Sequence, residues 1–133
     1  MIFEDDKKSL QYEDDKRSSF VYDKKIICVI WKKGVIIELE DAKDTMKYAL
    51  ENYNLGKPMP TYVDMTEISG MSRESRDYFQ NTNTGTSNAL ALVVASMLSR
   101  LIGNIFISMN QSGIPLKLFN EGEQAIEWLN TFT

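Results

Sequence analysis

The sequence lacks histidine altogether and contains a single cysteine, Cys28. Without histidine the chain cannot form a Ser-His-Asp triad, a Cys-His pair or a His-ligated metal site. One cysteine allows neither an internal disulfide nor a CxxC motif. The 15 Lys and Arg are outnumbered by 19 Asp and Glu, and general binding to nucleic acid requires clustered basic residues. The composition therefore predicts no metal, no cofactor and no nucleic-acid partner.

Export and membrane signals are also missing from the sequence. The N-terminus has no apolar segment of the kind found in a secretory signal, and a lone thiol suits a reducing compartment, so a cytoplasmic protein is expected. The most apolar stretch is residues 89–109, but Arg100 and Asn104 interrupt it. This pattern favours a buried strand followed by a buried helix over a membrane span. No Gly-rich phosphate loop occurs either.

Residues 1–17 are mostly charged, and residues 3–9 recur in near-identical form as residues 12–18. The positive and negative charges nearly cancel, and apolar residues are too sparse to bury a face. We expect a charged, mobile or loosely docked N-terminal arm, with residues 18–133 forming one domain. As an alternative, the near-repeat presents two copies of a partner-binding motif.

What is present after the arm is an alternation of β and helical patterns, in the order β-β-β-α-β-α-β-α-β-α. Strands are expected at residues 20–22, 26–31, 35–39, 61–65, 89–95 and 116–119, the third of them running antiparallel. The chain is thus expected to be a single-domain α/β protein, with a mixed sheet and helices packed on it. Cys28, inside the second strand, is expected to be an inert packed thiol.

The helices are defined by their apolar stripes and their caps. Ser72 is a candidate N-cap for a helix over residues 73–81, with an exposed turn over residues 81–88. Asn120 and Glu123 resemble a capping box for the last helix. The side chains expected to face inward are Ala42, Met46, Ala49, Leu50 and Tyr53; Tyr78 and Phe79; Met97, Leu98, Leu101, Ile102, Ile105, Phe106 and Met109; Ala125, Ile126, Leu129 and Phe132.

Several short motifs carry a family resemblance over about residues 19–132. They are Val63-Asp64, Ser72-x-x-x-Arg76-Asp77-Tyr78-Phe79, Gly103-Asn104-x-Phe106, Pro115-x-Lys117-x-Phe119 and Ala125-x-x-Trp128-Leu129. Together they resemble SpoIIAA-like domains, which have the STAS fold of anti-sigma-factor antagonists, and they look closest to uncharacterised bacterial members. The resemblance implies a SpoIIAA-like fold and a bacterial regulatory or protein-interaction role.

In STAS antagonists a serine at the start of the helix after the central strand is phosphorylated by a partner kinase, within a motif that is typically Asp-Ser-Ser-Gly-Leu. Residues 68–75 here read Ile-Ser-Gly-Met-Ser-Arg-Glu-Ser, without the double serine before glycine. The resemblance makes Ser72 the candidate phospho-switch, with Ser69 and Ser75 as rivals. Arg73 and Arg76 would stabilise a phosphate at the helix N-terminus; otherwise Ser72 is an ordinary N-cap.

Three further polar residues are candidates for a partner or ligand face. Asp64 ends a strand where α/β sheets commonly bind ligands, and it could pair with Asp77 or Glu74, or form a structural ion pair with Arg76. Arg100 and Asn104 are four residues apart on one helix and could face a cleft or an interface, where Arg100 could hold an anionic ligand or a partner carboxylate. Otherwise they form the polar edge of an amphipathic helix.

The sequence therefore predicts a non-enzymatic interaction module that binds a protein partner or a second copy of itself. Residues 66–76, beside the 81–88 turn, are its expected binding face. The alternative is a carrier of a small apolar ligand, because the architecture also resembles lipid-binding SEC14-type domains and the 97–109 stripe could line a pocket. A hydrolase that uses Asp64 is the third hypothesis.

Overall fold

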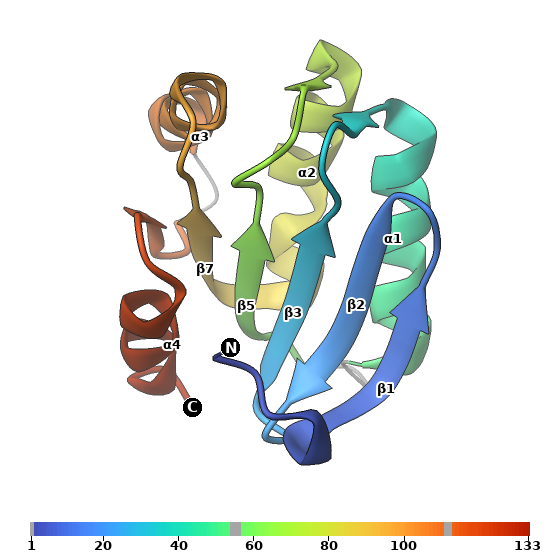
Figure 1. The fold of residues 1–133 in the computed structure, drawn as a ribbon, viewed down its shortest axis with the longest axis vertical. Helices are drawn as coiled ribbons and strands as arrows, with labels where there is room; N and C mark the ends of the chain where they lie inside the picture. The colour runs from blue at the N-terminus through green and yellow to red at the C-terminus, as the bar shows by residue number, and fades with distance from the viewer. Residues whose placement is uncertain (1, 54–56, 111–112) are drawn as a thin grey trace.

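The fold is an α/β sandwich built on one six-stranded sheet (Figure 1), seen in a computed structural model that describes residues 2–53, 57–110 and 113–133. The sheet strands are β1 (Lys8–Glu13), β2 (Arg17–Tyr22), β3 (Ile26–Trp31), β5 (Met59–Asp64), β7 (Ser87–Val93) and β8 (Leu116–Phe119). The helices are α1 (Leu39–Asn52), α2 (Arg73–Thr86), α3 (Met97–Met109) and α4 (Gly122–Asn130), with a short 3-10 turn over Asp5–Lys7. The expected α/β class is confirmed.

The spatial order of the strands is β1-β2-β3-β5-β7-β8. The first two pairings are antiparallel and the remaining three are parallel. The β2–β3 hairpin turns through Asp23 and Lys24, which both have positive φ, and the Lys25 amide donates to the Tyr22 carbonyl. Two positive φ values in succession match the right-handed twist of the strands that they join. The parallel strands need crossovers, and α1, α2 and α3 supply them.

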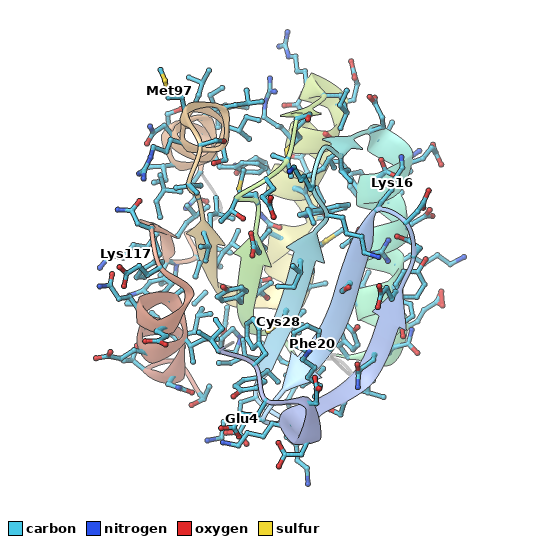
Figure 2. The ribbon with its side chains drawn as sticks, viewed as in Figure 1. Glu4, Lys16, Phe20, Cys28, Met97 and Lys117 are labelled. Carbon is cyan, nitrogen blue, oxygen red and sulfur yellow. The ribbon has the colours of Figure 1, made fainter. Side chains whose placement is uncertain are left out.

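Two apolar clusters fill the two faces of the sheet because alternate residues of each strand point to opposite sides. On β3, Ile27 and Val29 face α1 and α2, whereas Ile26 and Cys28 face α4. Figure 1 shows α1 and α2 behind the sheet and α4 with the N-terminal segment in front of it. Cys28 is fully buried, as expected, and burial raises the pKa of its thiol well above the usual range. Figure 2 places it in the middle of the sheet.

The N-terminal segment does not lie free, in contrast to the mobile arm that its charges suggest. Residues 8–13 pair with β2 as the edge strand β1, and Phe3 is 8% exposed. The ring of Phe3 makes edge contacts with Phe20, Tyr22 and Tyr62 at 5.0–5.2 Å between centroids. One well-placed aromatic residue and a free strand edge thus hold a segment whose overall composition is that of a solvated tail.

The local charges of this segment are largely paired. Asp14 accepts hydrogen bonds from the backbone amides of Lys16 and Arg17 and from the Tyr12 hydroxyl. Arg17 is buried, lies 3.6 Å from the Asp14 carboxylate and stacks over the Tyr12 ring. These contacts close the β1–β2 turn and keep the charged edge strand in place.

Three predicted elements differ in the structure. The strand expected at residues 35–39 is only β4 (Ile36–Ile37), which pairs in parallel with β6 (Gly70–Met71) in a small separate sheet, because helix α1 already begins at Leu39. The exposed turn expected at residues 81–88 is instead the end of α2 and the start of β7. The capping box expected at Asn120 is not formed: α4 begins after Glu121, which makes no side-chain cap.

The apolar stretch of residues 89–109 is a buried strand and a helix, as predicted, but the helix is buried along one side only. Within the residues that the structure describes, no helix is both long enough and apolar enough to cross a membrane. The inward stripes are only partly confirmed: Leu50 of α1 is exposed, and so are four of the seven apolar side chains expected to face inward on α3. The cause on α3 is geometric, since a helix that packs at the end of a sheet buries one narrow stripe.

Candidate interaction surface

Helix α3 begins at an N-cap, Ser96, whose hydroxyl accepts a hydrogen bond from the Ser99 amide at 3.0 Å. The helix faces the sheet with Ser99, Ile102, Gly103 and Phe106, all buried. A Cβ atom at Gly103 would lie 2.6 Å from a methyl of Leu118 and 3.3 Å from a methyl of Val94. The missing side chain therefore allows α3 to approach β7 and β8 closely, and this close approach leaves the wider apolar stripe uncovered.

The exposed side chains of this stripe, together with the half-buried Ile105, form a continuous apolar row, which we call the α3 face: Met97, Leu98, Leu101, Ile105 and Met109. Four of these residues recur at intervals of four, so they lie one above another along about 18 Å of helix. Met97 is 90% exposed and Leu101 is 58% exposed. Figure 2 shows Met97 projecting away from the body of the molecule. Contiguous exposed apolar patches of this kind are typical of interaction sites.

The polar residues that the sequence singles out on this helix lie beside the α3 face. Arg100 and Asn104 are both exposed, and within the described residues neither side chain has a hydrogen-bond or ion-pair partner. Arg100 is the only charged residue of α3. Its guanidinium is therefore free to contact whatever covers the neighbouring apolar row.

Ser72 is the N-cap of α2, as predicted. Its hydroxyl oxygen accepts a hydrogen bond from the Ser75 amide at 3.1 Å. The Ser75 hydroxyl is buried and lies within donating distance of the Ile37 and Ser72 carbonyls. The Ser72 amide donates to the Ile37 carbonyl. The start of α2 is thus held by backbone and hydroxyl contacts to β4.

The two arginines near Ser72 do not point at its hydroxyl. Arg73 is exposed and lies 3.9 Å from the Asp77 carboxylate, and Arg76 donates to the Met71 carbonyl at 3.0 Å. Asp64 accepts from the amide and hydroxyl of Thr66. In the part of the chain that the structure describes, Asp64 forms neither the ion pair with Arg76 nor the carboxylate pair that the sequence left open.

The fold places Ser72, at the start of α2, near helix α3, which carries Arg100 and Asn104. Strand β6 lies against α3 and directly precedes Ser72, so the start of α2 and α3 are adjacent. Asp64, by contrast, is held within the turn after β5 by its hydrogen bonds from Thr66. Sequence reasoning missed the α3 face because an apolar stripe on a helix normally marks the core side. The one feature of the sequence that indicated the α3 face was the width of the apolar stripe, which is greater than a helix needs in order to pack against one sheet.

The described residues contain no group of three or more Cys, Asp or Glu side chains that could hold a metal ion. The chain also has no histidine to contribute. The surface of α3 and the start of α2 thus offer apolar contact, the guanidinium groups of Arg100 and Arg73 and one capping hydroxyl, which is chemistry suited to recognition.

Comparisons with known proteins agree with the fold. The model of a family described as a domain of unknown function, DUF7793, matches residues 20–133. A solved structure of an uncharacterised protein of the DUF3478 family from Shewanella loihica PV-4, with a SpoIIAA-like fold, is similar at a TM-score of 0.59 and 13% identity, covering 90% of each chain. The expected SpoIIAA-like fold is thereby confirmed. No curated protein matches the chain significantly.

Proposed function

We propose that this chain, which belongs to the DUF7793 family of domains of unknown function, is a non-enzymatic interaction module of the bacterial cytoplasm that associates with a second copy of itself through the α3 face. The observation that carries the proposal is the row of exposed apolar side chains along α3. Such a row is costly to leave in water and gains free energy when it is covered.

A second copy suits this surface because of its charge. A symmetric dimer brings the same patch of each subunit into contact, and a charged patch would then meet its own charge. The α3 face is uncharged, with Arg100 at its side, so two copies can meet without repulsion. The apolar row extends along only about 18 Å of helix, and stable interfaces bury about 800 Å² on each partner. A weak, concentration-dependent dimer is therefore expected.

The test compares Leu101→Glu with Leu50→Glu. Both leucines are exposed on helices, to 58% and 54%, but Leu50 lies on α1, away from the α3 face. In sedimentation equilibrium over a range of concentrations, the unmodified protein and Leu50→Glu should dimerise, whereas Leu101→Glu should stay monomeric. An unmodified protein that is monomeric at every concentration, or two variants that dimerise equally, would refute the proposal.

Regulation by a phosphate on Ser72 is a further part of this proposal. A phosphoserine carries about −1.5 to −2 charges, and Ser72 lies beside α3. Aspartate is also a good N-cap, so Ser72→Asp should keep the start of α2 while weakening the dimer. If Ser72→Asp dimerises as well as the unmodified protein, the switch is refuted and the α3 contact stands.

The alternative of a small apolar-ligand carrier finds little support on α3, since most of the stripe that was expected to line a pocket lies on the surface. Of that stripe, Phe106 lines a partly open pocket between the sheet and helices α1 and α2.

A further inference from the structure

A cavity of about 60 Å³ lies between the sheet and helices α1 and α2. Its floor includes Ile27 of β3 and Leu90 of β7, and its roof includes Met46 of α1 and Phe79 of α2. A buried water takes roughly 10–15 Å³ measured in this way, so the cavity has room for roughly four to six water-sized groups. This space is separate from the exposed row on α3.

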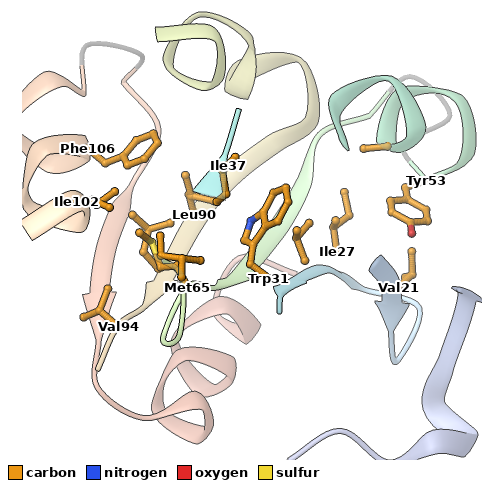
Figure 3. Packing of buried hydrophobic residues seen from close by; sticks show 14 residues of the cluster. Val21, Ile27, Trp31, Ile37, Tyr53, Met65, Leu90, Val94, Ile102 and Phe106 are labelled. Atoms are coloured by element: carbon orange, nitrogen blue, oxygen red, sulfur yellow. The ribbon is translucent and has the colours of Figure 1, made fainter. Parts of the chain in front are cut away.

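Two polar side chains that line the cavity have unused hydrogen-bonding groups. Trp31 is 4% exposed and Asn83 is 7% exposed. Among the described residues, neither the indole N–H of Trp31 nor the side-chain amide of Asn83 has a hydrogen-bond partner. Figure 3 shows the indole of Trp31 within the core cluster, between Ile27 and Leu90. Because both residues line the cavity, these groups are available to hydrogen-bond with a molecule inside it. Among the described residues, the fully buried side-chain nitrogen without a partner is Arg76 Nε, which is not part of the cavity lining.

The neighbouring hydroxyl groups on the cavity wall are, by contrast, already satisfied. Thr45 donates to the Asp41 carbonyl at 2.7 Å. The hydroxyls of Thr61 and Ser87 lie 2.6 Å apart, and Thr61 also contacts the Met59 carbonyl. The unmet hydrogen-bonding capacity is therefore concentrated on Trp31 and Asn83.

We infer that this cavity binds a small uncharged molecule with a short apolar body and a carbonyl oxygen. Trp31 can only donate a hydrogen bond and Asn83 can donate as well as accept, so an acceptor atom is the chemistry that suits both. Among the described residues lining the cavity none is charged, and a charged ligand would be buried without a counter-ion. The apolar floor and roof fit the apolar body.

Butanamide and butanoate test the inference, because the two have the same number of non-hydrogen atoms and differ in charge. In the Trp128→Phe variant, Trp31 is the remaining tryptophan of the chain and reports on the cavity by its fluorescence. We expect saturable changes with butanamide and none with butanoate at pH 7. In proton–nitrogen NMR spectra of the unmodified protein, the Trp31 indole and Asn83 amide signals should shift in the same titration.

Asn83→Leu should weaken butanamide binding by about tenfold or more, since it removes a hydrogen-bond donor at a buried site. Asn81→Leu is the matched control, because Asn81 is on the same helix and exposed, and it should bind as the unmodified protein does. The inference is overturned if neither NMR signal responds to butanamide, if butanoate binds equally well, or if both groups contact only bound water. The NMR titration decides the matter even if Asn83→Leu fails to fold.

Discussion

Replacement of Phe3 by alanine should destabilise the protein strongly, although Phe3 lies in a segment that is mostly charged. The ring is 8% exposed and makes edge contacts with three aromatic rings, those of Phe20, Tyr22 and Tyr62. Removal of a buried phenylalanine side chain typically costs about 3–5 kcal/mol. Because Phe3 keeps 8% of its surface exposed, we expect a loss at the lower end of this range, about 3 kcal/mol in the free energy of unfolding.

The assay is urea denaturation followed by far-UV circular dichroism, with linear extrapolation to water. In thermal unfolding the same loss corresponds to a fall in Tm of about 12 °C, at about 4 °C per kcal/mol for a domain of this size. Leu10→Ala is the control in the same segment: Leu10 is exposed, so its loss should stay below about 0.5 kcal/mol. A loss below about 1 kcal/mol for Phe3→Ala would refute the docking of the segment and restore the mobile arm.

Three further outcomes are expected. Ile27→Ala should cost about 2–5 kcal/mol in the same urea assay and Ile30→Ala less, because Ile27 is buried and Ile30 only partly so; equal losses would contradict the assigned faces of β3. Ser72→Ala should cost about 1 kcal/mol through the lost cap, and an unchanged stability would contradict the cap. Burial opposes ionisation of Asp14, but hydrogen bonds from Tyr12, Lys16 and Arg17 outweigh it and lower its pKa. Its stabilisation is therefore present above about pH 4 and is lost as the pH falls below that value, so Asp14→Asn should lose less stability than the unmodified protein between about pH 5 and 2.

Much of the candidate site could be placed from the sequence, but its role could not. The capping position of Ser72 follows from a local pattern, namely a serine just before a helical run. The orientation of α3 does not, because the apolar row of Met97 and Leu101 looks the same whether a core or a partner covers it. Asn83 was assigned to an exposed turn, since its neighbours are Asn, Thr and Gly. In the folded chain it is part of α2 and lines the cavity with Trp31.

The sequence by itself determined the α/β class, the four helices and the buried central strands β3 and β7. These follow from periodicity, which acts between residues close together in the chain. Only the tertiary structure decided that the charged N-terminus pairs with β2, that α3 keeps an apolar row in solvent, and that a cavity lies between the sheet and α1 and α2. Those features depend on which surfaces meet after folding, and that depends on the fit of distant side chains such as Phe3 against Tyr62 and Gly103 against Leu118.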